Sequence, residues 1–309
     1  MIKFGELSDE QMAQKIQRAL KLQEIEVVIE RETTNNILSL FVSDEAHLPK
    51  AYDCFRVHLG FPPHFDIPPE MEQISRLPWG YVTKILMIIG TMIGGWLLYL
   101  ESPEQLSVLF MSETDSGFLV EVMAGQWWRL WTPMFLHFGI LHILFNMICF
   151  KDFGSLVEHQ HGIKRYLALI LIVGLVSNLG QYAVAGPQFG GFSGVLFGLL
   201  GLVWVYKVFN PLSEFSLPKS SVVMLLVWFF LCLVGVIPGI ANTAHALGLS
   251  LGILAGMALG IHDRKNNAPL PLGPFLGYSM LSLSIAVLTY LIEGFKLDGR
   301  FYYLRFFQS

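Results

Sequence analysis

Residues 242–261 read NTAHALGLSLGILAGMALGI, twenty residues without an Asp, Glu, Lys or Arg. A helix of this length crosses the hydrocarbon core of a bilayer, which is about 30 Å thick. Small residues recur at every fourth position, at Ala244, Gly248, Gly252, Gly256 and Gly260. One face of the helix is therefore nearly bare, and a second helix with a similar face can pack closely against it. The stretch predicts a transmembrane helix within a helical bundle.

The composition of the whole chain agrees with a membrane protein. Of its 309 residues, 53% are hydrophobic and 14% are charged, with a mean hydropathy of +0.54, whereas soluble domains carry about 25% charged residues. The apolar stretches predict spans near 82–100, 135–152, 165–184, 193–206, 221–238, 242–261 and 273–294. The fourth of these is too short to cross a bilayer alone. It should begin part-way down the membrane, reached by non-helical chain that protein shields from lipid.

The N-terminal residues 1–60 have the pattern of a small soluble α+β domain with the element order β-α-β-β-α. Residues 2–7 predict a strand, and Ser8 with Gln11 matches a capping box at the start of the following helix. Residues 61–80 contain five prolines, which break both helices and ladders, and predict a linker. We therefore divide the chain into a domain, a linker, a membrane domain and a further helix with its tail, at 1–60, 61–80, 81–262 and 263–309.

The distribution of Lys and Arg predicts a cytoplasmic N-terminus. Basic residues gather before the first span and in the loops after the second, fourth and sixth spans, whereas the alternate loops hold almost none. Lys296, Arg300 and Arg305, after the last span, disagree mildly with this orientation. Four consistent positions outweigh them.

A serine between glycines opens the fourth span, in Gly190-Gly191-Phe192-Ser193-Gly194. Glycine permits a tight turn and close backbone approach, and the free N–H groups of a helix start can face an oxyanion. This is what a serine hydrolase needs. Taken alone, the motif favours helix packing instead, because Gly190, Gly194 and Gly198 also have small-xxx-small spacing.

His245 is the candidate base for Ser193. The fourth and sixth spans both run from the outer side inward, so the two residues lie at similar depth. A serine hydroxyl is a weak nucleophile until a base takes its proton, and a partly desolvated imidazole stays neutral and able to accept one. No carboxylate lies in the third to sixth spans, so we predict a Ser–His dyad rather than a triad, with Phe197 placed to stack on the imidazole. The alternative is a histidine that only hydrogen-bonds between helices.

His142 and Asn146 are candidate oxyanion donors. They lie four residues apart and share one face of the second span, and each can donate a hydrogen bond to a developing negative charge. The alternative is that they join helices together. His137 lies roughly 140° around the same predicted helix from His142, so we interpret it as structural.

Other chemistries lack their residues. A zinc protease needs HExxH on a helix, and the nearest approach, Glu158-His159-Gln160-His161, has the wrong order. An aspartyl intramembrane protease needs two membrane aspartates, which the predicted spans lack. The three cysteines have no CxxC spacing, and the chain has no basic stripe for nucleic acid. We therefore expect no metal site and no nucleic-acid partner.

Four stretches together resemble rhomboid proteases, in the order and at the spacing of that family. They are Trp128-Arg129, residues 137–146, residues 186–194 and residues 244–248, and the resemblance covers about 80–262. Residues 1–60 more weakly resemble the cytoplasmic domain of bacterial GlpG-type rhomboids. The resemblance implies an α-helical membrane protein with a six-helix rhomboid core and a small α+β cytoplasmic N-terminal domain. The uncharged stretch near 273–294 adds a seventh C-terminal transmembrane helix to this expectation.

The resemblance also implies a serine endopeptidase that cleaves transmembrane segments of membrane proteins without metal or cofactor. It makes Ser193 the nucleophile and His245 the base, with His142, Asn146 and the Ser193 amide around the oxyanion. Its structural motif residues are Trp128, Arg129, Gly191, Gly194 and Gly248. It further implies a bacterial inner membrane, with the active site opening to the periplasmic side.

Two features depart from the GlpG pattern: Phe197 replaces a tyrosine, and a seventh span follows the core. Two other functions stay open. One is a rhomboid-like pseudoprotease that binds membrane clients without cutting them, although such proteins lack Ser or His at the dyad positions. The other is a transporter, which would show a polar path and often inverted repeats. The oligomeric state and the natural substrate are undetermined.

Overall fold

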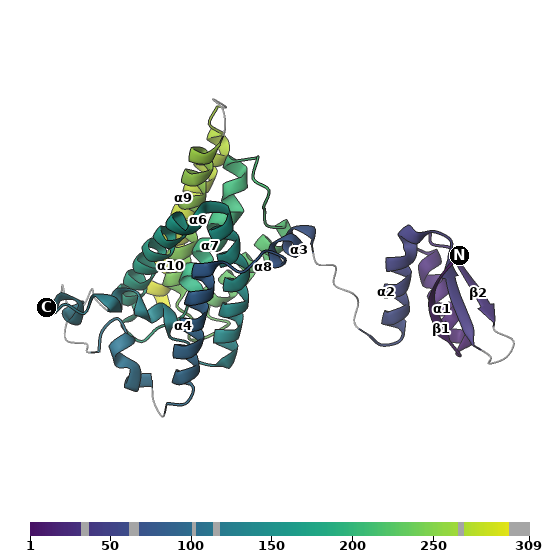
Figure 1. Cartoon of the computed structure of the whole chain (residues 1–309), viewed down its shortest axis with the longest axis horizontal. Coiled ribbons are helices and arrows are strands. Elements are labelled where there is room, and N and C mark those ends of the chain that lie inside the picture. Colours follow the sequence, from purple (N-terminus) through teal and green to yellow (C-terminus); the bar gives the residue numbers. More distant parts are fainter. Residues whose placement is uncertain (32–36, 62–67, 101–102, 114–117, 265–268, 297–309) are drawn as a thin grey trace. The chain divides into compact units, whose positions relative to one another are not determined.

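A computed structural model describes residues 1–31, 37–61, 68–100, 103–113, 118–264 and 269–296. Part of the predicted linker lies outside these residues, as do Arg300 and Arg305. The chain divides into two compact units, Met1–Ile67 and Pro68–Ser309, drawn in Figure 1.

The first unit is a three-stranded antiparallel sheet with the strand order β1-β3-β2 and two helices (Figure 1). Apolar side chains from both helices and the sheet form its core, among them Ile16, Leu40 and Phe55. The predicted α+β pattern is confirmed. Its elements are β1 (Ile2–Leu7), α1 (Glu10–Lys21), β2 (Val27–Arg31), β3 (Leu38–Val42) and α2 (Leu48–His58).

The predicted capping box at Ser8 is wrong. Asp9 caps α1, and its Oδ1 accepts hydrogen bonds from the amides of Gln11 at 2.9 Å and Met12 at 3.2 Å. A capping residue is extended and directly precedes the first helical residue. Since α1 begins at Glu10, Asp9 holds that position rather than Ser8.

The second unit is helical. Among the residues of this unit that the structure describes, three helices are long and apolar enough to cross a membrane, namely α6, α9 and α10, and three shorter apolar helices, α4, α7 and α8, accompany them. The α-helices of this unit, in chain order, are α3 (Pro69–Ser75), α4 (Tyr81–Leu97), α5 (Val120–Met123), α6 (Ile140–Ala185), α7 (Ser193–Phe209), α8 (Lys219–Leu233), α9 (Asn242–Asp263) and α10 (Leu272–Lys296).

Helix α6 contains both the second and the third predicted span. Gly162 interrupts it with φ 76° and ψ 162°, so it consists of two helical segments. The predicted start of the second span at residue 135 is wrong. Residues Thr132–Phe135 form a 3₁₀ turn, and the helix begins only after Gly139, whose φ of 120° is not helical.

Helices α7 and α9 make the closest contact in this unit, through their small residues. A Cβ added at Gly248 would collide with the carbonyl oxygen of Gly194, and one at Gly252 with that of Gly198. The two backbones therefore touch where glycine removes the side chains. This packing brings the beginnings of the two helices, with Ser193 and His245, to one end of the bundle.

Candidate active site

Ser193 and His245 are in hydrogen-bond contact, with 2.7 Å between the serine Oγ and the imidazole Nε2. Ser193 is the first residue of α7, and His245 lies in the first turn of α9, where only 4% of it is exposed. Phe197, one turn below Ser193, lies over the imidazole with ring centroids 4.6 Å apart and planes tilted by 35°. The imidazole is thus held between the serine and an aromatic ring.

No carboxylate orients His245 in the part of the chain that the structure describes. Its Nδ1 is buried and has no hydrogen-bond partner there. When Nε2 accepts a hydrogen bond from the serine hydroxyl, the neutral ring carries its own hydrogen on Nδ1. Packing against Phe197 and the contact with Ser193 therefore hold the ring.

The turn before Ser193 depends on two glycines. Gly191 has φ 122°, and its amide donates to the Pro133 carbonyl at 3.1 Å. A Cβ there would lie 2.7 Å from His142 Nε2 and 3.6 Å from Ser193 Oγ, while one at Gly190 would lie 2.6 Å from Leu136 Cβ. The missing side chain at Gly191 thus leaves room for His142 beside the serine.

Asn146 is oriented differently from His142. Its Nδ2 donates to the His142 carbonyl at 3.0 Å, one turn back along α6, and only 5% of the residue is exposed. An amide nitrogen has two hydrogens, so one remains for another acceptor.

His137 lies beside the site, contrary to the angular argument from the sequence. Its ring centroid is 5.0 Å from that of His142, and its Nδ1 contacts the Phe135 carbonyl at 3.0 Å. The 140° separation applies only where one continuous helix runs through both residues. Because α6 begins at Ile140, the turn before it places His137 against His142.

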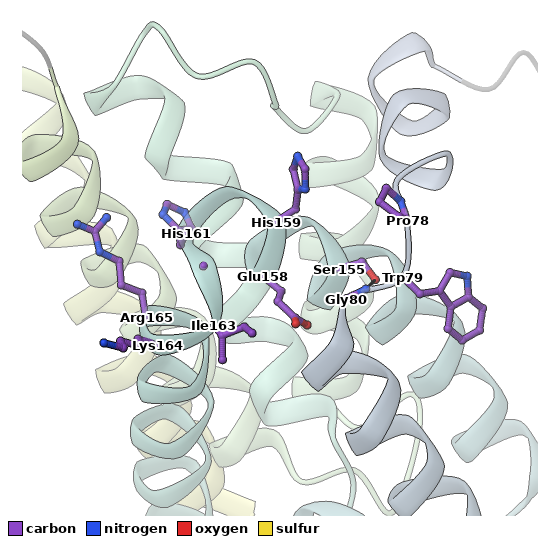
Figure 2. Close-up of a pocket in the computed structure, with 11 residues that line it drawn as sticks. Pro78, Trp79, Gly80, Ser155, Glu158, His159, His161, Ile163, Lys164 and Arg165 are labelled. Atoms are coloured by element: carbon purple, nitrogen blue, oxygen red, sulfur yellow. Dashed lines mark hydrogen bonds between the residues drawn. The ribbon is translucent and has the colours of Figure 1, made fainter.

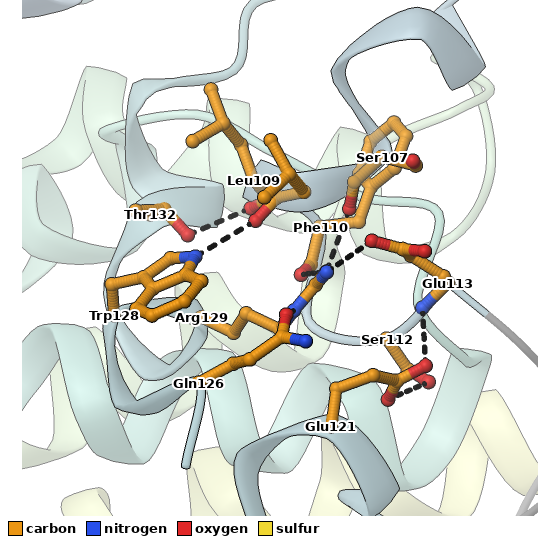
Figure 3. Close-up of polar contacts among 11 residues, drawn as sticks. Ser107, Leu109, Phe110, Ser112, Glu113, Glu121, Gln126, Trp128, Arg129 and Thr132 are labelled. Atoms are coloured by element: carbon orange, nitrogen blue, oxygen red, sulfur yellow. Dashed lines mark hydrogen bonds and ion pairs between the residues drawn. The ribbon is translucent and has the colours of Figure 1, made fainter. Parts of the chain in front are cut away.

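Trp128 and Arg129 belong to a polar cluster between α4 and α6 (Figure 3). Arg129 is fully buried, donates to the carbonyls of Ser107 at 2.7 Å and Phe110 at 2.9 Å, and pairs with Glu113. Trp128 Nε1 donates to the Val108 carbonyl at 3.0 Å. These bonds satisfy backbone carbonyls of a loop that has little regular structure of its own. Trp128 and Arg129 therefore have a structural role.

Glu121 completes this cluster. Its carboxylate accepts from Ser112 Oγ at 2.7 Å and from the Glu113 amide at 3.0 Å. Burial raises the pKa of the Glu121 carboxyl, but these hydrogen bonds and the Arg129 charge outweigh burial, so the pKa lies below its ordinary value. The carboxylate is therefore ionised near neutral pH and stays an acceptor.

The cavity at Ser193 is narrow. It measures about 10 Å³, which is room for about one water molecule, and its lining includes Gly191, Ser193, Phe189 and Met134. The expectation was that the active site opens to the outer side of the membrane. In this conformation, apolar side chains of the lining restrict that opening.

A larger cavity, of about 810 Å³, lies at the break in α6 (Figure 2). The rings of His161, next to the break, and Tyr206, near the end of α7, lie 4.7 Å apart. The break therefore lies at the opposite end of α7 from Ser193. Glu158 lines the cavity, and its carboxylate accepts from the amides of Val82 and Thr83, both at 2.9 Å. Glu158 thus satisfies the first amides of α4, which is a structural role.

In comparison with known proteins, residues 124–262 match the Rhomboid domain. These residues form a rhomboid domain. The Rhomboid protease GlpG of Klebsiella pneumoniae is 34% identical over 139 residues, which are 45% of this chain and 50% of that protein. The GlpG homolog of Cronobacter sakazakii is 33% identical over 141 residues, 45% of this chain and 51% of that protein. The chain spans about half the length of these curated relatives.

The rhomboid domain contains all the predicted site residues, whereas α4 and α10 lie outside the matched residues. With its apolar helices, the domain makes the chain an integral membrane protein. Sequence reasoning missed His137 and Gln181 near the dyad. Gln181 Oε1 accepts from the Ala244 amide, at 3.2 Å, beside His245. A lone Gln inside the third predicted span was the available signal, because buried polar groups need partners.

Proposed function

We propose that this protein is an intramembrane serine endopeptidase that cleaves transmembrane segments of other membrane proteins. The observation that carries the proposal is the 2.7 Å contact between Ser193 Oγ and His245 Nε2, at a glycine turn within a rhomboid domain. The relatives named as proteases share this domain. No metal or cofactor is needed for the steps below.

In the first half of the reaction, Ser193 Oγ attacks the carbonyl carbon of the scissile peptide bond while its proton passes to His245 Nε2. The carbonyl oxygen becomes an oxyanion. His142 lies beside Ser193, and the Ser193 amide opens α7, so both are placed to donate to that charge. Collapse of the intermediate breaks the C–N bond, and the leaving amine takes the proton from His245.

In the second half, water attacks the acyl-serine ester. His245 Nε2 takes a proton from the water, and the new oxyanion uses the same donors. Collapse releases the carboxylic acid product, and the proton returns to Ser193 Oγ.

We place the protein in a bacterial inner membrane, with a cytoplasmic N-terminus and the dyad near the periplasmic side. The charge pattern of the loops supports this orientation. Substrate segments that unwind easily, with Gly, Pro or small polar residues near that surface, should be preferred, because these residues weaken a helix.

The test is cleavage of a transmembrane test substrate by the purified full-length protein in detergent. We expect Ser193→Ala and His245→Ala each to lower kcat by more than about 10³-fold, because the two residues act as one unit. Ser284→Ala, at an exposed serine of α10, is the control and should keep the wild-type rate.

Cleavage by Ser193→Ala would mean that another residue is the nucleophile. A folded wild type that cuts none of several transmembrane substrates would favour the client-binding pseudoprotease. Capture of an intact membrane protein by that wild type would then be the supporting result.

A further inference from the structure

The most deeply buried side chains of α10 are polar, although several of its apolar side chains are partly buried against the core. Its buried residues are Ser282, Thr289 and Gly294, while most of its apolar side chains are exposed on the outside of the bundle. Ser282, Thr289 and Glu293 are seven and four residues apart, so they share one face. A polar face on an otherwise apolar helix is costly in a membrane unless it has specific partners.

Ser282 and Glu293 of this face have hydrogen-bond partners on α9. Ser250 Oγ donates to the Ser282 carbonyl at 3.0 Å, and Ser282 Oγ donates to the Ser250 carbonyl at 3.2 Å. Nearer the start of α9, Asn242 Nδ2 donates to Glu293 Oε1 at 3.1 Å. Lys296 also donates to this oxygen, at 3.0 Å, and the Glu293 side chain is only 13% exposed. The Glu293 carboxylate is thus held between α10 and α9.

Asn242 is the first residue of α9, three residues before His245. The first turn of a helix lacks intrahelical acceptors for its amides and needs outside partners. Gln181 of α6 supplies one such acceptor, to the Ala244 amide at 3.2 Å. Glu293 holds the same turn from the α10 side. The turn that carries His245 is therefore fixed from two different helices.

We propose that Glu293 is a positioning residue for the reaction: through Asn242, it holds the first turn of α9 so that His245 Nε2 stays in contact with Ser193 Oγ. This inference rests on the proposed protease function. It assigns a role to α10, which follows the matched rhomboid residues. The requirement is geometric, because a displacement of about 1 Å in a reacting group can lower the rate about 10²-fold.

If α10 only stabilised the bundle, Glu293→Leu and Ser282→Ala would affect the melting temperature and kcat in the same way. A positioning role for Glu293 predicts that the two variants differ in kcat. Ser282 bonds to Ser250, which follows His245 by more than one turn. Removing its hydroxyl should lower the melting temperature and leave kcat of the folded protein unchanged. Glu293→Leu should lower the melting temperature and kcat together.

The experiment measures kcat, KM and melting temperature of the full-length protein with a transmembrane test substrate, for wild type, Glu293→Leu, Glu293→Gln, Asn242→Ala and Ser282→Ala. We expect Glu293→Leu and Asn242→Ala to lower kcat about 10- to 100-fold, with KM changed less than about twofold, because only the alignment of the base changes. Glu293→Gln keeps an acceptor oxygen for Asn242 and should keep kcat within about threefold.

The double variant Glu293→Leu with Asn242→Ala should be no slower than either single variant, because both remove one contact. Wild-type kcat in Glu293→Leu or Asn242→Ala, or additive losses in the double variant, would overturn the inference. So would an equal loss of kcat in Ser282→Ala. If Glu293→Leu does not fold, Asn242→Ala and Glu293→Gln decide the question. A wild type that cuts nothing would instead overturn the proposed function itself.

Discussion

At the residue scale, Gly191 decides whether His142 can lie beside the serine. Its φ of 122° is a conformation that side chains rarely adopt, and the space where a Cβ would stand is taken by His142 Nε2. The glycine therefore serves both the turn and the close approach of His142 to Ser193.

Gly191→Ala should lower kcat by at least about 10²-fold, because the methyl group displaces His142 from the oxyanion. Gly125→Ala is the matched control. Its φ is 100°, but nothing lies within 4 Å of an added Cβ, so it tests backbone strain without the steric effect. We expect Gly125→Ala to lower the melting temperature and keep kcat. Similar losses of kcat in both variants would contradict this account.

His142 and Asn146 should differ in their effect on the rate. His142→Ala removes an imidazole that lies beside Ser193 across Gly191 and should cost about 10²- to 10³-fold in kcat. Asn146→Ala should cost less, because its amide is bonded to the His142 carbonyl and keeps only one hydrogen for the substrate. Steady-state kinetics of the two variants checks the order. A larger loss in Asn146→Ala would mean that the amide turns toward the oxyanion when substrate binds.

At the element scale, contact between the α7 and α9 backbones fixes the depth of the dyad. The two helices meet through glycines, so neither can shift along the other without steric overlap. The glycines of this contact do not touch the Ser193 or His245 side chains. The 2.7 Å distance between serine and imidazole nevertheless depends on how the two helices pack.

Gly252→Ala should therefore destabilise the bundle by about 1–3 kcal/mol, the usual range for overpacking a tight contact. Its Cβ would collide with the Gly198 carbonyl oxygen. Gly277→Ala, on α10, meets nothing within 4 Å and should leave stability nearly unchanged. Thermal unfolding in detergent compares the two. Equal stability of both variants would mean that α7 and α9 separate more easily than the structure indicates.

At the scale of the whole molecule, the proposed orientation can be tested with single cysteines. With Cys54, Cys149 and Cys232 replaced by serine, Leu22→Cys and Tyr99→Cys place thiols at sites that are 88% and 90% exposed. Residue 22 lies in the N-terminal unit and residue 99 after α4. We expect an impermeant maleimide to label only Tyr99→Cys in spheroplasts, and both after permeabilisation. Labelling of Leu22→Cys alone would reverse the topology.

Much of the fold and of the site follows from the sequence itself. Long uncharged stretches, the four-residue spacing of small residues and the glycines around Ser193 are local patterns, and they indicate spans, a close helix pair and a candidate nucleophile. The contact between His245 and Ser193 could be predicted because two helices that run in the same direction bring their first turns to the same depth. Helix geometry is regular enough for such arguments.

The tertiary structure alone decided the features that depend on irregular backbone or on distant contacts. The cap at Asp9 and the start of α6 at Ile140 differ from the predictions because short-range patterns leave element ends uncertain. His137 reaches His142 through a non-helical turn, and Glu293 reaches Asn242 across 51 residues of chain. Contacts of this kind arise only when separate helices pack, because no periodicity in the sequence relates the two partners.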